Sequence, residues 1–361
     1  MEDKKMYYRD YLQLDKVLNA QEPESFKPGN EPAHDEMLFI IVHQAAELWF
    51  KQILFELDYV MSVFRKSRID DNSEDLNIVR HRLNRIIRIN ELLNEQVSIL
   101  HTMTPLDFLE FRNLLSPASG FQSVQFRLIE ARLGLEMENR HNKDYYKRTN
   151  EGGFEPKDFT SITDVEKEEN LLSLVNKWLE RMPFFQPEYW SAAGSPQSAD
   201  ENHPFWKEYR KRYVESLTER EAMKVKDFDF TFFQKKDDLT EEQMAMLKSA
   251  LSPKAMQAGL FIMLYRDFPV FQTSYQILDS LVEIDHQMAT WRHKHLVMVR
   301  RMIGMRMGTG NTSGSGYLEG ALNKHYVFKD VAALSTFLIE RKRLPELPGE
   351  LIGKLSYNSE K

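Results

Sequence analysis

Histidine is the side chain on which any metal chemistry of this chain depends. The sequence has ten histidines and no cysteine, which excludes thiolate metal sites, disulfides and cysteine nucleophiles. Trp291, His295 and Met298 recur at steps of three and four residues, so they share one face of a predicted helix. The pattern fits a core histidine bonded to a neighbour. On the pattern alone this interpretation is preferred, but the pattern also fits an axial ligand with a flat apolar cofactor, such as haem, against the helix.

Two further positions could bind an organic ligand. Phe39 and His43 are four residues apart, which places an aromatic wall beside one polar group. Without other information, buried packing is the favoured interpretation of this pair. Arg112 lies in an apolar helical segment, 108–115, and a buried guanidinium needs a partner. That partner is either an acidic side chain of the protein or a substrate carboxylate held by two hydrogen bonds.

Two other segments are weaker candidates. Residues 304–316 are rich in glycine and hydroxyl groups but lack the Gly-Lys-Ser/Thr ending of a phosphate loop, which favours a loop that closes over a ligand. The His34-Asp35-Glu36 step could contribute to a non-haem iron site. Such sites usually lie in β-sandwiches, so we interpret these residues as the start of a helix, with the acids favourably near its N-terminus.

The elements that must position these residues are predicted to be helices. The 361 residues include only 15 glycines and 14 prolines. Their combined share of the sequence is below the usual value of roughly 12%. Residues 38–60 are apolar on all sides, which predicts a helix buried in the middle of a bundle. Residues 227–233 alternate with period two and predict a loop or lone extended piece. The remaining predicted helices cover residues 73–101, 104–115, 124–137, 164–181, 240–251, 254–265, 275–305 and 330–341. We predict an all-α, single-domain helical bundle over residues 1–361, with residues 183–250 as a peripheral helical insertion.

Charge and hydropathy limit the partners. A net charge of −7 gives no reason to expect a nucleic-acid partner. The longest apolar stretch, residues 37–50, is interrupted by polar side chains and is too short to cross a bilayer. The first residues are not followed by the apolar segment that a signal peptide would have. We therefore expect a cytoplasmic protein without a membrane partner.

Four blocks of this sequence resemble the haem-dependent tryptophan 2,3-dioxygenase family. They are Tyr8-Arg-Asp-Tyr11-Leu12 with its continuation to Gln21, His34 to Gln52, Phe111 to Arg127, and Trp291 to Gly310. The blocks follow the family's order over most of the chain, while residues 138–250 match less clearly. The resemblance implies insertion of both atoms of O2 across the indole C2–C3 bond of L-tryptophan, giving N-formylkynurenine. It also implies one haem b per subunit, ferrous in the active form.

The resemblance assigns a role to each matching residue. His295 falls at the proximal ligand of the haem iron, on the same helix face as Trp291, and His43 falls at the distal histidine that hydrogen-bonds the indole N–H. Arg112 falls at the residue that binds the substrate carboxylate. Thr309 falls at the residue that contacts the ammonium and carboxylate groups. The pocket is expected to be lined by Phe39, Phe108 and Leu115.

The N-terminal block implies an assembly. Tyr8, Tyr11 and Leu12 match a segment that in the family reaches into the site of a neighbouring subunit. The resemblance thus implies a homotetramer, a dimer of dimers, in which residues 1–30 form an arm.

The glycine loop departs from the family pattern. It has Asn311 and Thr312 where the family commonly has glycine and serine, and Asn311 lacks glycine's freedom at positive φ. Two alternatives therefore stay open. One is a haem oxygenase of the same fold that acts on a substituted indole or another aromatic substrate. The other is a non-catalytic haem-binding helical protein.

Overall fold

Helices make up the regular structure. The computed structural model describes residues 6–67, 69, 74–135, 153–186, 189–190, 201–236, 239–304, 306 and 325–355. Over these residues the chain forms α-helices linked by loops and short 3-10 turns, and no strand occurs among them. The predicted all-α class is therefore confirmed.

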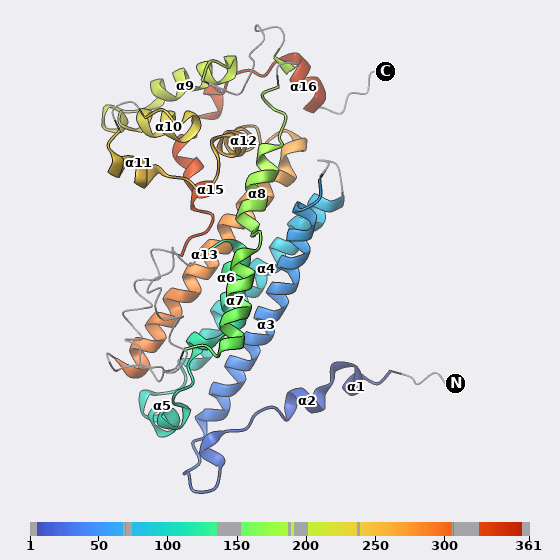
Figure 1. Ribbon diagram of the computed structural model, residues 1–361, viewed down its shortest axis with the longest axis vertical. Helices are drawn as coiled ribbons and strands as arrows, with labels where there is room; N and C mark the ends of the chain where they lie inside the picture. The colour runs from blue at the N-terminus through green and yellow to red at the C-terminus, as the bar shows by residue number, and fades with distance from the viewer. Residues whose placement is uncertain are drawn as a thin grey trace.

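Five helices form the elongated body of the molecule (Figure 1). They are α3 (Asp35–Phe64), α4 (Glu74–Leu100), α6 (Val124–Leu133), α8 (Leu171–Glu180) and α13 (Pro269–Ile303). The α4 helix packs against both α3 and α13. Leu57, Leu83 and Leu281 are fully buried, one from each of these three helices. The predicted helices over residues 38–60, 73–101, 124–137 and 275–305 thus exist, although α6 already ends at Leu133. Residues 73, 136, 137 and 305 lie outside the described part of the chain, Ser73 being the expected cap of α4.

The helix that carries Arg112 starts as its sequence predicts. In α5 (Pro105–Arg112), Pro105 takes the first helical position. The Thr104 hydroxyl accepts a hydrogen bond from the Asp107 N–H at 3.3 Å, and the Asp107 carboxylate accepts one from the Thr104 N–H at 2.8 Å. This reciprocal capping box satisfies two backbone donors at the helix start.

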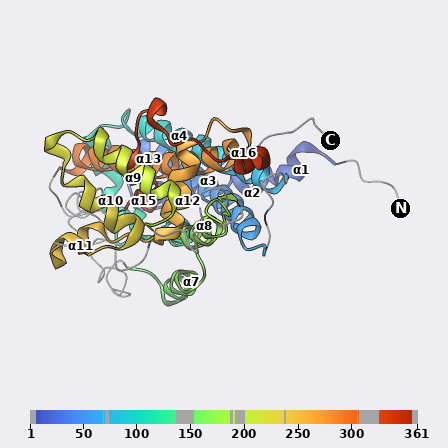
Figure 2. The same cartoon turned by 90° about the horizontal axis from the view of Figure 1, so that it is seen from above.

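A second group of helices covers one end of the body (Figures 1 and 2). It consists of α9 (Pro204–Ser216), α10 (Lys224–Phe233), α11 (Glu241–Leu247), α12 (Pro253–Leu264), α15 (Lys329–Ala333) and α16 (Gly349–Leu355). The prediction of an extended piece over residues 227–233 is wrong, because these residues belong to α10. Helical spacing brings Phe228 and Phe232 together against Trp206, with ring centroids 6.3 and 5.4 Å from it. Burial of these rings outweighs the local period-two pattern.

Two predicted helices are interrupted. Residues 164–181 do not form one helix: α7 (Pro156–Lys167) ends and α8 begins anew, with the Asn170 side chain accepting from the Ser173 N–H at 2.9 Å. Figure 2 shows α7 on the outside of the body. Residues 330–341 are likewise not one helix. The short α15 is followed by a 3-10 turn at Leu334–Phe337, and Leu338 is extended.

The prediction that residues 38–60 are buried on all sides is wrong for one face of α3. Ile41, Leu48, Phe55 and Tyr59 are spaced along that face and are 38–69% exposed. We call these four residues the α3 stripe. The reason is that α4, α6 and α8 cover only the other side of α3. By length and composition alone α3 could cross a membrane, a property that core helices of soluble proteins share.

The N-terminal arm leaves the body beside α3. Its helices α1 (Tyr8–Leu12) and α2 (Leu14–Leu18) project away from the bundle (Figures 1 and 2). The root of the arm is fixed, because the Glu36 carboxylate accepts the N–H groups of Glu24 and Ser25, each at 2.8 Å. His34 precedes α3 and Asp35 opens it, as predicted, with both acids in the first turn.

Candidate functional site

One cavity joins most of the residues singled out from the sequence. It has a volume of about 260 Å³, which is room for several water molecules. Side chains of α3, α4, α5, α6 and α13 line it, and most of its surface is apolar. The lining residues predicted from sequence are Phe39, His43, Phe108, Arg112, Trp291 and His295. The structure therefore brings these six residues, which span positions 39 to 295 of the chain, together at one site.

His295 borders this cavity from α13. Its ring stacks on the Trp291 ring one turn earlier, with centroids 5.2 Å apart and planes within 4°. The Nδ1 atom is buried without a hydrogen-bond partner in the described part of the chain. Burial, together with a smaller effect of the neighbouring His43, lowers the pKa of His295 to about 4. The imidazole is therefore neutral at pH 7, the form in which histidine can bind a metal.

His43 borders the same cavity from α3. Its Nδ1 lies 2.7 Å from the backbone carbonyl oxygen of Phe39. A carbonyl oxygen only accepts, so Nδ1 carries the proton and Nε2 has a free lone pair. Burial lowers the pKa of His43, although the Phe39 carbonyl and Glu47 oppose this. A neutral His43 can thus accept a hydrogen bond from an N–H group in the cavity.

Aromatic rings form a wall next to His43. The Phe39 ring lies 4.1 Å from the His43 ring and 5.8 Å from that of Phe108, measured between centroids. Phe111 is fully buried behind them, 5.6 Å from Phe39 and 5.4 Å from Phe108. The predicted wall therefore exists, and Phe111 is a supporting ring that sequence analysis did not single out. Such a wall suits a flat aromatic ligand.

A guanidinium group completes this side of the cavity. Arg112 is half-buried at the last position of α5, where the helix dipole favours a positive charge. It lines the cavity together with Phe39 and His43. A flat aromatic group and a carboxylate on one ligand would find complementary partners here.

Comparisons with known proteins agree with this geometry. A family profile described as Tryptophan 2,3-dioxygenase matches residues 1–338. The protein of that name from Bdellovibrio bacteriovorus is 41% identical, with 98% of each chain covered. Its namesake from Alteromonas mediterranea is 39% identical, with 97% of each chain covered. The namesake from Dictyostelium discoideum is 40% identical over 96% of this chain and 86% of its own.

This chain belongs to the tryptophan 2,3-dioxygenase family. The family resemblance of the sequence is thereby confirmed, and so is its assignment to an enzyme family.

Other predicted site residues of this family member lie elsewhere. Leu115 is outside the cavity lining and packs, as Phe39 and Phe108 do, against the buried cluster that includes Phe111. Tyr8, Tyr11 and Leu12 are exposed on α1, which does not line the cavity of its own chain. Thr309 lies outside the described residues, as do Asn311 and Thr312.

The non-haem iron alternative has no support from the structure. The described residues contain no group of three or more histidine, aspartate or glutamate side chains that could hold a metal ion. Glu36, which that alternative would use, instead holds the root of the arm.

A buried charged cluster in the cavity wall was missed from the sequence. Glu130 accepts hydrogen bonds from Arg127 and Arg292, each at 2.9 Å, and His325 lies next to it. All four residues line the cavity. Arg292 is thus buried and bound to a protein acid, whereas Arg300, Arg301 and Arg306, further along the chain, are exposed. The Arg127–Glu130 spacing of three residues was the only local signal.

Proposed function

We propose that this protein is a haem-dependent dioxygenase that converts L-tryptophan and O2 to N-formylkynurenine. Both oxygen atoms enter the product as the indole C2–C3 bond is cleaved, so no other reductant or oxidant is consumed. The observation that carries the proposal is one cavity bordered by two neutral imidazoles, His295 and His43, with an aromatic wall and Arg112 beside the second. Membership of the family supports it.

The residues on the His295 side fit a haem group. A neutral, cavity-facing imidazole without a partner at Nδ1 in the described residues is suited to bind iron. Trp291 holds its ring plane by stacking. We infer that His295 is the ligand of one haem b per subunit. Ferrous haem, when bound, supplies the iron at which O2 reacts.

The residues on the His43 side fit L-tryptophan. The Phe39 and Phe108 rings offer apolar walls for the indole, and Nε2 of His43 can accept its N–H. Arg112 offers two parallel donors to the substrate carboxylate. These contacts fix the indole relative to the cofactor and exclude water, which is the protein's share of the catalysis. Leu115 and Thr309 remain proposed members of the substrate site.

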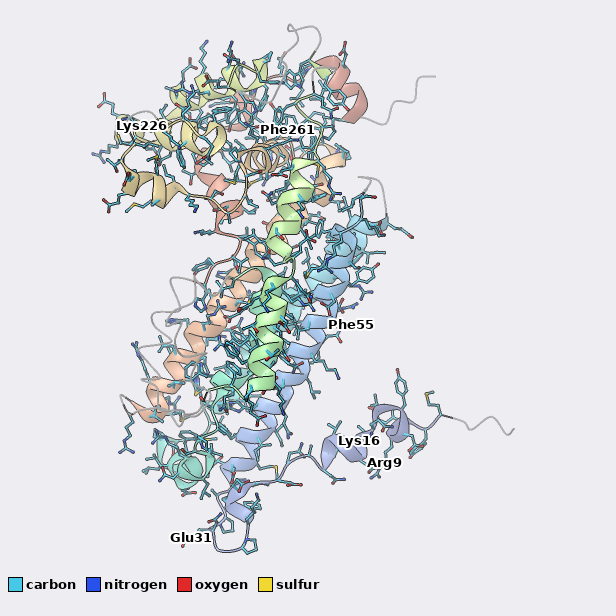
Figure 3. All side chains as sticks on the ribbon, viewed as in Figure 1. Arg9, Lys16, Glu31, Phe55, Lys226 and Phe261 are labelled. Atoms are coloured by element: carbon cyan, nitrogen blue, oxygen red, sulfur yellow. The ribbon has the colours of Figure 1, made fainter. Side chains whose placement is uncertain are left out.

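We infer that the enzyme is a homotetramer, a dimer of dimers, in the cytoplasm. The α3 stripe is an apolar face that one chain leaves uncovered, and Phe55, labelled in Figure 3, lies on it. Exposed apolar faces of this kind mark protein interfaces. The projecting arm, labelled at Arg9 and Lys16 in Figure 3, gives Tyr8, Tyr11 and Leu12 the freedom to reach a neighbouring subunit's cavity.

Oxygen labelling tests the reaction. Reduced, haem-loaded protein is mixed with L-tryptophan under ¹⁸O2, and the product is analysed by mass spectrometry. We expect N-formylkynurenine with two ¹⁸O atoms. A product with one labelled oxygen would contradict dioxygenation and favour a haem oxygenase of the same fold that inserts a single oxygen atom, whereas no product from haem-loaded protein would favour another substrate.

A further inference from the structure

A single carboxylate binds two arginines in the cavity wall next to His295. Glu130 is 1% exposed, and Arg127 and Arg292 are each 6% exposed. The Glu130 Oε2 atom accepts from Nη1 of Arg127, and its Oε1 atom accepts from Nη2 of Arg292, both at 2.9 Å. Nδ1 of the buried His325 lies 3.4 Å from Oε1. Glu130 thus ties α6 and α13 to the segment that begins at His325.

This cluster is attached to the turn of α13 that carries His295. Arg292 directly follows Trp291, whose ring stacks on the His295 ring. The Phe126 ring lies 5.0 Å from the Trp291 ring, and the Arg127 and Arg292 guanidinium groups lie 5.6 and 5.9 Å from the Phe126 ring. Arg292 also donates to the His325 carbonyl oxygen at 3.3 Å. A change at Glu130 therefore reaches His295 through groups in direct contact.

Stability alone does not explain the cluster. Removing a carboxylate and two guanidinium groups from water costs several kcal/mol per ion, so a buried ion pair contributes little net stability. What such a pair does provide is a fixed arrangement of charges. In a low-dielectric wall, these charges act on any nearby cofactor with little screening.

We propose that Glu130 is a positioning residue for the cofactor. It holds Arg127 and Arg292 in place behind Trp291 and His295, and it keeps a negative charge near the metal site. Oxidised haem iron carries one more positive charge than reduced iron, so this negative charge lowers the ferric–ferrous midpoint potential. This inference rests on the proposed haem site.

Glu56 provides a matched control. It is also 1% exposed and also binds two arginines, Arg82 at 3.2 Å and Arg85 at 2.7 Å. It lies on α3 and does not line the cavity. Glu130→Gln and Glu56→Gln therefore remove the same buried carboxylate, one beside the proposed haem site and one away from it, although the arginines of Glu56 are more exposed, at 31% and 51%.

The test measures the midpoint potential and the rate of haem transfer to an excess of apomyoglobin. For Glu130→Gln we expect a more positive potential and haem loss about 10-fold to 100-fold faster, the range typical when a group that supports a metal ligand is removed. For Glu56→Gln we expect wild-type values of both, with only a lower melting temperature. Equal values in the two variants would overturn the inference.

A second variant separates charge from structural damage. Arg127→Gln removes a positive charge and leaves the Glu130–Arg292 pair, so the potential should shift in the negative direction, opposite to Glu130→Gln. Local structural damage alone would not make the two variants shift the midpoint potential in opposite directions. If Glu130→Gln does not fold, a positive or absent shift in Arg127→Gln overturns the inference. If the wild-type protein binds no haem, the proposed function itself is refuted. This outcome distinguishes failure of the proposed function from failure of the role proposed for Glu130.

Discussion

At the scale of single residues, the site depends on the protonation states of two histidines. Burial keeps both His295 and His43 neutral, and the Phe39 carbonyl selects the His43 tautomer with a free Nε2 lone pair. One histidine can therefore bind a metal, and the other can accept a substrate N–H. Neither property is visible in the sequence, because burial and a specific hydrogen bond create them.

Arg112 gives a prediction at this scale. Arg112→Leu should raise KM for L-tryptophan at least about tenfold, because a hydrogen bond to a charged group contributes about 1.5–3 kcal/mol. It should leave haem binding unchanged. Steady-state kinetics and a haem titration measure the two effects, with Arg80→Leu on the exposed side of α4 as the control. An unchanged KM would refute the carboxylate role of Arg112.

At the scale of elements, helix starts and amphipathic spacing were predictable, while tertiary contacts were not. The Thr104 cap and Pro105 mark the start of α5 in the sequence, and the structure agrees. The period-two pattern of residues 227–233 was misleading, because Phe228 and Phe232 pack against Trp206 from a helix. Glu130 was missed for a related reason, since its partner Arg292 is 162 residues away.

The α3 stripe gives a prediction at this scale. Phe55 is 69% exposed in one chain, so the charge introduced by Phe55→Glu should leave folding of the subunit intact. If the stripe is a subunit interface, the buried charge should split the assembly into smaller species. Sedimentation velocity measures this, with the exposed Leu106→Glu on α5 as the control. A tetramer that persists in Phe55→Glu would rule out the stripe as an interface.

At the scale of the whole molecule, separate parts of the chain have separate tasks. The long helices α3 and α13 carry the two histidines, and α4, α5 and α6 complete the cavity. The aromatic core of α9, α10 and α12 closes one end of the body, and α9 and α10 lie where the sequence predicted only an insertion. The sequence named the cavity residues that helical spacing and family motifs mark, but it missed most of the others, Glu130 among them. It could not show that they share a cavity, since contacts distant in sequence decide that.

The central claim is that this cavity holds haem through His295. The most direct test is a titration of apoprotein with haem, followed by absorption spectroscopy, for wild type, His295→Ala and His293→Ala. His293 is exposed on the same helix and serves as the control. We expect one haem per subunit in wild type and His293→Ala, and no stable binding in His295→Ala. Full haem occupancy with a wild-type spectrum in His295→Ala would contradict the account.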